Sequence, residues 1–150
     1  MKKTLLVIIA IIGLGFAANA QSAIGLRGAF GSRSGVEVSY QTPAWGERLE
    51  VDFGWYGYHH HNSIYLAGVY QWTWNIVSQL GWYAGVGANI GVRTWEDGAG
   101  FGLGVLGQIG LEWTFPRIPL KLSVDIRPQI DVFGDSHFGM AGALGVRYVF

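Results

Sequence analysis

Apolar and polar side chains alternate with a period of two over most of the chain. Between residues 120 and 132 the even positions carry Leu, Val, Ile and Pro, whereas the odd positions carry Lys, Ser, Asp, Arg and Gln. Successive side chains of a β-strand point to opposite faces of a sheet, so this alternation predicts a strand with one apolar and one polar face. The last segment, 138–150, follows the same rule.

Eight segments pass this test, and turn-forming residues such as Gly, Pro, Asn, Asp and Ser are concentrated between them. After residue 20 no segment shows the 3.6-residue period of an amphipathic helix. The sequence therefore predicts an all-β fold, an eight-stranded antiparallel up-and-down barrel that forms one domain. The predicted strands are residues 23–30, 34–41, 48–58, 63–74, 80–94, 101–115, 120–132 and 138–150.

Alternation alone leaves open whether the apolar face points into a protein core, as in a secreted lipocalin-like barrel, or outward into lipid. Charged residues within the strands, beginning with Arg27 and Glu37, all fall on polar-face positions. The polar face is also rich in Gly, and Lys121 is the only Lys after residue 20, which is unusual for a soluble surface but suits a narrow interior. An Arg or Lys on a lipid-facing strand costs about 2–4 kcal/mol. We therefore predict a transmembrane β-barrel with an ionic interior.

We expect the charges of the polar face to form a mutually satisfied network, because an unpaired buried charge is costly. Such a network would close the lumen and fix the register of the strands. The alternative is a narrow path for water or ions along the Gly-lined sector beside Tyr83 and Leu106. The residues predicted to form the interior charge network are Arg27, Glu50, Asp52, Arg93, Glu112, Lys121, Asp125, Arg127, Asp131 and Arg147.

Aromatic residues cluster where the predicted strands end, which is typical of the two girdles that membrane barrels place at headgroup level. Pro128 interrupts the seventh strand, and since proline has no N–H to donate to a neighbouring strand, we expect a β-bulge there. The two predicted girdles are Trp74, Trp82, Trp113, Phe115, Tyr148 and Phe150 at one rim, and Phe30, Trp55, Phe101 and Phe138 at the other.

The first twenty residues have the composition of a secretory signal peptide. Lys2 and Lys3 precede an apolar run, and Ala18-Asn19-Ala20 offers small residues at the positions that a signal peptidase reads. We expect cleavage before Gln21, which leaves residues 21–150 as the barrel. The formal net charge of zero and the lack of a basic cluster argue against a nucleic-acid partner, and the absence of Cys excludes disulfides and Cys-ligated metals.

Two stretches resemble a known class of protein. The ending Gly145-Val146-Arg147-Tyr148-Val149-Phe150 resembles the C-terminal signal by which bacterial outer-membrane barrels are recognised for assembly. Residues 118–128, preceded by 110–115, are similar to the penultimate hairpin of small eight-stranded outer-membrane barrels of Bacteroidota. The resemblance implies location in a Gram-negative cell outer membrane, contact with outer-membrane lipids, and delivery to the barrel-assembly machinery through Phe150. It implies no activity.

Candidate chemistry is confined to two predicted outward turns. His59 and His61 could share a metal ion, but no third ligand is assured. Asp135-Ser136-His137 has the residue types of a catalytic triad, although neighbours in sequence seldom place a base on its nucleophile. We therefore predict solvated turns with no catalytic residue, no metal and no cofactor.

The sequence thus favours a non-enzymatic integral outer-membrane barrel with a structural or lipid-facing role and a lumen plugged by charge. With an even number of strands, both termini face the periplasm, and the four outward connections are short, which gives little support to a large adhesive surface. Two alternatives stay open. One is an outer-membrane lipid-modifying enzyme that uses outward-rim His and Ser residues, and the other is a narrow, porin-like pore.

Overall fold

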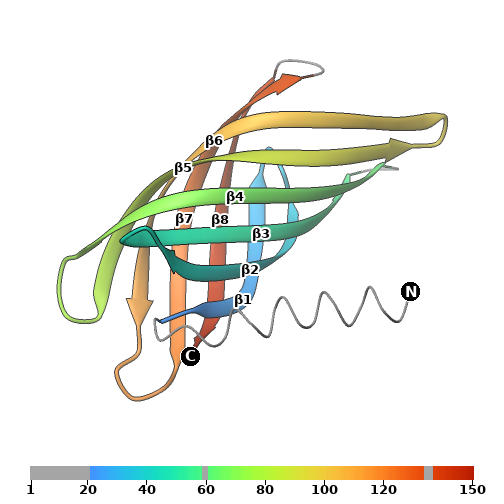
Figure 1. The fold of residues 1–150 in the computed structure, drawn as a ribbon. Helices are drawn as coiled ribbons and strands as arrows, with labels where there is room; N and C mark the ends of the chain where they lie inside the picture. Colours follow the sequence, from blue (N-terminus) through green and yellow to red (C-terminus); the bar gives the residue numbers. More distant parts are fainter. Residues whose placement is uncertain (1–20, 59–60, 134–136) are drawn as a thin grey trace, which may run out of the picture.

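A computed structural model describes residues 21–58, 61–133 and 137–150. Eight antiparallel strands follow one another around a closed barrel, and the first pairs with the last (Figure 1). The predicted all-β, eight-stranded up-and-down barrel is therefore confirmed. The strands are β1 (Ala23–Gly31), β2 (Gly35–Ala44), β3 (Glu47–Tyr58), β4 (His61–Asn75), β5 (Leu80–Trp95), β6 (Gly98–Thr114), β7 (Leu120–Phe133) and β8 (Phe138–Val149).

The two ends of the barrel are named here by the chain termini. At the terminal end, Ser22 and Phe150 exchange two backbone hydrogen bonds of 3.2 and 2.9 Å, and the β2–β3, β4–β5 and β6–β7 turns lie at the same end. The other four connections lie at the far end. The predicted signal peptide, residues 1–20, lies outside the described residues. In the described part of the chain, no helix has the length and apolar character needed to cross a membrane.

The side chains are distributed in the reverse of a soluble barrel. In β7, Leu122, Val124 and Ile126 are 39%, 44% and 48% exposed, whereas Asp125 and Arg127 between them are 2% and 4% exposed. The same alternation of exposed apolar and buried polar positions recurs in the other strands. The apolar face therefore points outward and the ionic face fills the barrel, as the alternation and the charge positions predicted.

The turn between β2 and β3 is tighter than the sequence indicated. Pro43, which we assigned to the turn, lies in β2 and is paired with Arg48 of β3. Trp45 and Gly46 alone form the connection, with φ values of 49° and 85°. Positive φ at both central residues is typical of a type I′ turn, whose twist matches that of the flanking strands. Trp45 occupies the left-handed region without being Gly, and its side chain is 86% exposed.

The predicted bulge at Pro128 is wrong in position. Pro128 pairs with Met140 of β8 in regular register. The β6–β7 ladder is interrupted opposite Pro128 but resumes in the same register, because the proline lacks only the N–H that would face β6. The register shifts further along, where Leu103 pairs with Phe133 and the next residue, Gly104, pairs with Asp131. The extra residue therefore lies at Val132, near the far end of β7.

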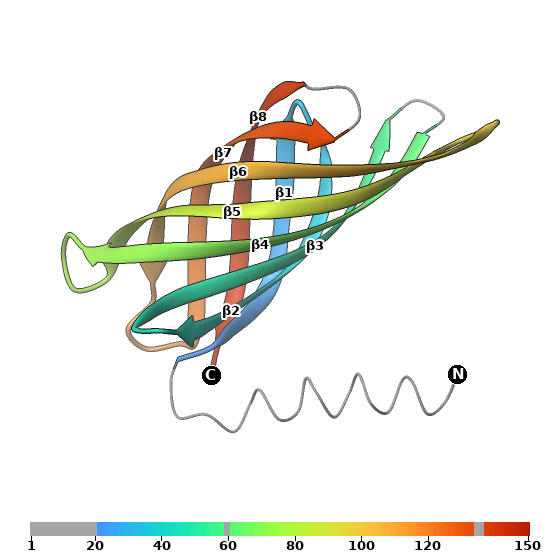
Figure 2. The ribbon, with the colours of Figure 1, turned by 45° about the horizontal axis from the view of Figure 1, so that its top comes forward.

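The barrel wall is taller on one side than on the other. β4, β5 and β6 have 15, 16 and 17 residues, whereas β1 and β2 have 9 and 10. Figure 2 shows β5 and β6 continuing as a paired ribbon past the far rim of the shorter strands. We predicted a turn over residues 96–100, but Gly98 already pairs with Trp95, so Glu96 and Asp97 alone make the connection.

Candidate functional site

The interior of the barrel is the candidate site, and its centre is organised around Arg27 of β1. One terminal nitrogen of this guanidinium pairs with Glu37 of β2 and lies 3.2 Å from Asp52 of β3. The other terminal nitrogen lies 2.6 Å from Asp125 of β7. The register places Glu37 directly beside Arg27 on the neighbouring strand, whereas Asp52 and Asp125 reach it from further around the wall. A single side chain thus joins four strands.

Arg127 of β7 reaches the same group of acids. Its Nη2 lies 2.6 Å from Asp52 and 3.2 Å from Glu50, both on β3. Asp52 is therefore shared between Arg127 and Arg27. Each of these side chains is almost completely buried. Because desolvation penalises every buried charge, the sharing of partners is what makes their burial tolerable.

Arg147 of β8 completes the centre. Its Nη2 lies 2.9 Å from Glu50 and 3.0 Å from the hydroxyl of Ser39, and its Nη1 donates to the hydroxyl of Ser123 at 2.7 Å. Glu50 also accepts hydrogen bonds from the side-chain amides of Gln41 and Gln108, at 2.5 and 3.1 Å. Glu50 is thereby held by charge-assisted contacts from several strands.

A second group of charges lies nearer the terminal end. Arg48 of β3 forms a two-pronged pair with Glu112 of β6, at 2.8 and 3.0 Å, and Lys121 of β7 lies 3.8 Å from the same carboxylate. The Nε of Arg48 donates to Gln71 at 2.6 Å, and its guanidinium lies 5.0 Å from the centre of the Tyr83 ring. This group covers the central charges from the terminal end.

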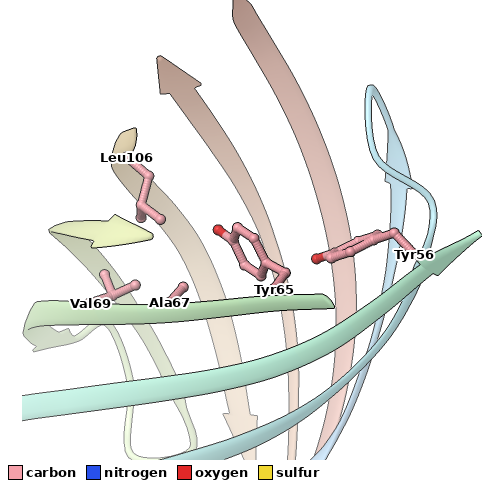
Figure 3. Packing of buried hydrophobic residues seen from close by; sticks show 5 residues of the cluster. All are labelled: Tyr56, Tyr65, Ala67, Val69 and Leu106. Carbon is pink, nitrogen blue, oxygen red and sulfur yellow. The ribbon is translucent and has the colours of Figure 1, made fainter. Parts of the chain in front are cut away.

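A third group lies nearer the far end. Arg33, in the β1–β2 turn, pairs with Asp131 of β7 at 3.1 Å and lies 5.0 Å from the centre of the Tyr65 ring. Tyr56 donates its hydroxyl to Glu37, and its ring meets Tyr65 edge to face at 5.5 Å. Figure 3 shows both tyrosines projecting into the interior from β3 and β4, with Ala67, Val69 and Leu106 beside them. Charge and small apolar packing together fill this end.

Nine of the ten predicted network members form ion pairs within these three groups. Arg93 is the exception: β5 continues past the barrel rim, so its side chain is exposed and does not join the network. Tyr83 and Leu106, which we expected to border a possible path, are both buried.

Three members of the network were missing from the sequence prediction. Glu37 lay on the polar face by alternation, so the pattern contained the signal but we did not include it. Arg33 and Arg48 were assigned to a turn and a strand end, and their long side chains reach inward from there. With them, the described ion pairs involve six acidic and six basic residues, namely Glu37, Glu50, Asp52, Glu112, Asp125 and Asp131 with Arg27, Arg33, Arg48, Lys121, Arg127 and Arg147.

Glycine at one position allows two large groups to meet inside the wall. A Cβ built on Gly110 of β6 would lie 2.6 Å from the Tyr83 ring and 2.7 Å from the Cβ of Asp125. Real Cβ atoms do not approach so closely, so any larger residue would displace Tyr83 or Asp125. The Tyr83 hydroxyl donates to Asp125 at 3.0 Å across this glycine. The Gly-rich polar face thus makes room for the interior contacts.

The outer surface carries aromatic residues at both rims. Trp74 and Trp82 stack at 4.2 Å near the terminal end, where Tyr148 and Phe150 also stack at 6.3 Å. At the far end, Phe30, Trp55, Phe101 and Phe138 are exposed, whereas Trp82 and Phe115 of the terminal rim are half-buried. Between the rims the exposed residues are mainly Leu, Val and Ile.

The predicted turn chemistry is largely beyond the described part of the chain. His59, His60, Asp135 and Ser136 lie outside the described residues. His61, which we assigned to the turn, is the first residue of β4, and His137 is exposed immediately before β8. Within residues 21–58, 61–133 and 137–150, no three His, Asp or Glu side chains are arranged to hold a metal ion. The interior network is accordingly the one site for which this structure gives detailed geometry.

No protein-family model matches the chain, and no curated protein matches it in sequence. Solved structures match its fold. Neisserial surface protein A (NspA) is 15% identical with a TM-score of 0.61, covering 87% of this chain and 96% of its own. The N-terminal β-barrel domain of Pseudomonas aeruginosa OprF is 18% identical with a TM-score of 0.64, covering 87% and 98%. Ail, the attachment invasion locus protein of Yersinia pestis, is 13% identical with a TM-score of 0.56, covering 89% and 100%. At these identities the likeness is one of fold.

Proposed function

We propose that this chain is an integral protein of a Gram-negative outer membrane. The observation that carries the proposal is the reversed polarity of the barrel, in which Leu, Val, Ile and aromatic side chains are exposed while twelve ionised side chains face the lumen. A continuous exposed apolar belt of this kind is unfavourable in water and suits acyl chains. The fold likeness to outer-membrane barrels supports the same location.

In this location the terminal end faces the periplasm and the far end faces outward, as expected for an even number of strands. The signal peptide at residues 1–20 directs export and is removed before Gln21. Fractionation of cells that express the full chain tests the location: the processed chain should be extracted from the outer-membrane fraction only with detergent. Its recovery in the aqueous fraction without detergent would contradict the proposal.

The role that we propose is non-enzymatic, structural or lipid-facing, with a lumen closed to ions. Arg27, Arg127 and Arg147 cross the narrow interior to acids on β3, and all of these groups are buried. An ion in transit would have to break pairs that offset a large desolvation cost. Planar bilayers containing the purified protein should therefore show no steady single-channel currents. Steady currents would favour the pore alternative and overturn the closed lumen.

The partner that we propose is the barrel-assembly machinery, which would recognise the C-terminal segment ending at Phe150. Removal of Phe150 should reduce the amount of folded barrel in the outer membrane, measured by the fraction that stays compact in unheated detergent gels. Phe115→Ala alters another aromatic residue of the same rim and serves as the control. Equal folded fractions for both variants would remove the case for recognition through Phe150.

A further inference from the structure

A small cavity lies inside the barrel on the far-end side of the central charges. Its volume is about 10 Å³, which is room for roughly one atom of water size. The lining comes from strands on both sides of the barrel and includes Arg27, Arg127, Tyr65 and Glu37. Arg33, in the β1–β2 turn, also borders it. The cavity is therefore surrounded by three guanidinium groups and one carboxylate.

Several hydrogen-bond donors of this lining have no partner. Among the described residues nothing accepts from the Nε or Nη1 of Arg127, from the Nε of Arg27, or from the hydroxyl of Tyr65. These three residues are 4%, 1% and 2% exposed, so bulk water does not reach them. The nearest carboxylate oxygen to Arg127 Nη1 belongs to Glu37 and is 3.9 Å away, beyond hydrogen-bond distance.

The carboxylate that lines the cavity is already engaged. Both oxygens of Glu37 are taken, one by the Tyr56 hydroxyl and the other by Arg27. The other carboxylates that pair with Arg27 and Arg127, namely Glu50, Asp52 and Asp125, do not line the cavity. The unpartnered buried acceptors, Gln41 Oε1 and Asp52 Oδ1, also lie outside the lining. The lining thus carries three guanidinium groups and one carboxylate that is already engaged, which makes the cavity electropositive.

We propose that this cavity is a binding site for one small monovalent anion of halide size. A water molecule accepts two hydrogen bonds and donates two, whereas the unpartnered atoms of the lining are three guanidinium nitrogens and the Tyr65 hydroxyl, so donors outnumber the one oxygen that can accept. A halide accepts from all of the donors at once and is attracted by three guanidinium groups. Because six acidic and six basic side chains already balance along the lumen, the anion adds an uncompensated charge, and its dissociation constant is in the millimolar range, about 1–50 mM.

Thermal unfolding of the purified barrel in detergent tests the site. The midpoint should be higher by about 3–15 °C in 200 mM sodium bromide than in 200 mM sodium gluconate, because a ligand that binds the folded state stabilises it. Equal ionic strength removes the general effect of screening. Tyr65→Phe removes one donor and should lose most of this difference. Equal midpoints for the unaltered protein in the two salts would overturn the proposal.

Tyr83→Phe is the matched control, because Tyr83 is also a buried interior tyrosine but its hydroxyl donates to Asp125 and does not line the cavity. It should keep the full bromide increment. Crystals soaked in bromide supply a second measurement: an anomalous peak is expected within about 3.5 Å of Arg127 and Tyr65. A cavity without such a peak, occupied by water alone, would also overturn the proposal, and neither result would bear on whether the barrel lies in the outer membrane.

Discussion

Arg27, Arg127 and Arg147 are the residues that tie the barrel together across its lumen. Their acidic partners are far away in the sequence: Arg27 and Asp125 are 98 residues apart, and Arg147 and Glu50 are 97 apart. Each arginine presents several donors in a fixed planar arrangement, so one side chain can satisfy carboxylates from different strands. These contacts fix how opposite sides of the wall meet, which backbone pairing between neighbours does not do directly.

Replacing Arg127 with Ala should lower the stability of the barrel. The change would leave Glu50 without one of its cationic contacts and Asp52 without its closest, at 3.2 and 2.6 Å. Removal of one partner from a buried ion pair costs about 3–5 kcal/mol. Thermal or urea unfolding in detergent would measure the loss. Arg93→Ala is the control, because Arg93 is exposed and outside the network. Equal stabilities for the two variants would contradict the role of the network.

The sequence allowed most of this site to be predicted. Once a strand is known, the alternation of its residues alone shows whether a side chain points into the barrel or out of it. It could not show the pairing, which depends on which distant strands face each other across the lumen. Arg127, for example, pairs with Glu50 and Asp52 on β3 and not with Asp125 or Asp131, which are its near neighbours in the sequence. The alternation also predicts burial wrongly where a strand extends beyond the barrel, as at Arg93, which is exposed.

At the scale of elements, strand identity was predictable and the points of irregularity were not. Pro128 marked β7 as unusual, but its missing N–H is accommodated by a local break in the ladder with β6. The register shift occurs at Val132 instead, and no residue type there predicts it. Gly98 and Gly100 looked like turn material, yet they extend β6 because residues of β5 are available to pair with them. Pairing partners, rather than local preference, set these boundaries.

A substitution in β6 tests whether glycine is required for the interior to pack. Gly110→Ala should destabilise the barrel by about 1–3 kcal/mol, as overpacking generally does, because its Cβ would lie 2.6 Å from Tyr83. Gly28→Ala is the matched change on the outer face of β1, where a Cβ would meet nothing within 4 Å. Urea unfolding of both variants gives the comparison. A Gly110→Ala barrel as stable as Gly28→Ala would show that Tyr83 can move aside without cost.

At the scale of the whole molecule, the barrel reverses the usual relation between polarity and burial. Apolar side chains cover the outside between two aromatic rims, and the ion pairs occupy the inside in three groups along the lumen. This arrangement was predictable because two independent features of the sequence agree, the period-two alternation and the absence of charge from its apolar positions. The unequal height of the wall could not be predicted from the sequence, because it depends on where the pairing between neighbouring strands stops.

A charged side chain on the outer apolar face should destabilise the barrel more than one in a turn. The difference should be larger in a bilayer than in detergent. Val124→Arg places a guanidinium on the outer face of β7, where Val124 is exposed. Its cost in lipid vesicles should be about 2–4 kcal/mol near mid-bilayer. Ile118→Arg, in the exposed β6–β7 turn, should cost less than about 1 kcal/mol. Urea unfolding in vesicles would distinguish them, and equal losses would show that β7 does not face acyl chains.

The short wall formed by β1 and β2 has a consequence for the surrounding lipid. A strand tilted by about 45° needs roughly 9–11 residues to cross a bilayer, so the nine residues of β1 just suffice, whereas the seventeen of β6 exceed the requirement. In the membrane location proposed above, the acyl layer must be thinnest where it touches β1, and the protein stands higher on the opposite flank. Hydrophobic mismatch then differs around the molecule, because a thick bilayer is compressed only beside the short strands. Lipids with short acyl chains, or other barrels with short strands, would relieve the most strain on that side.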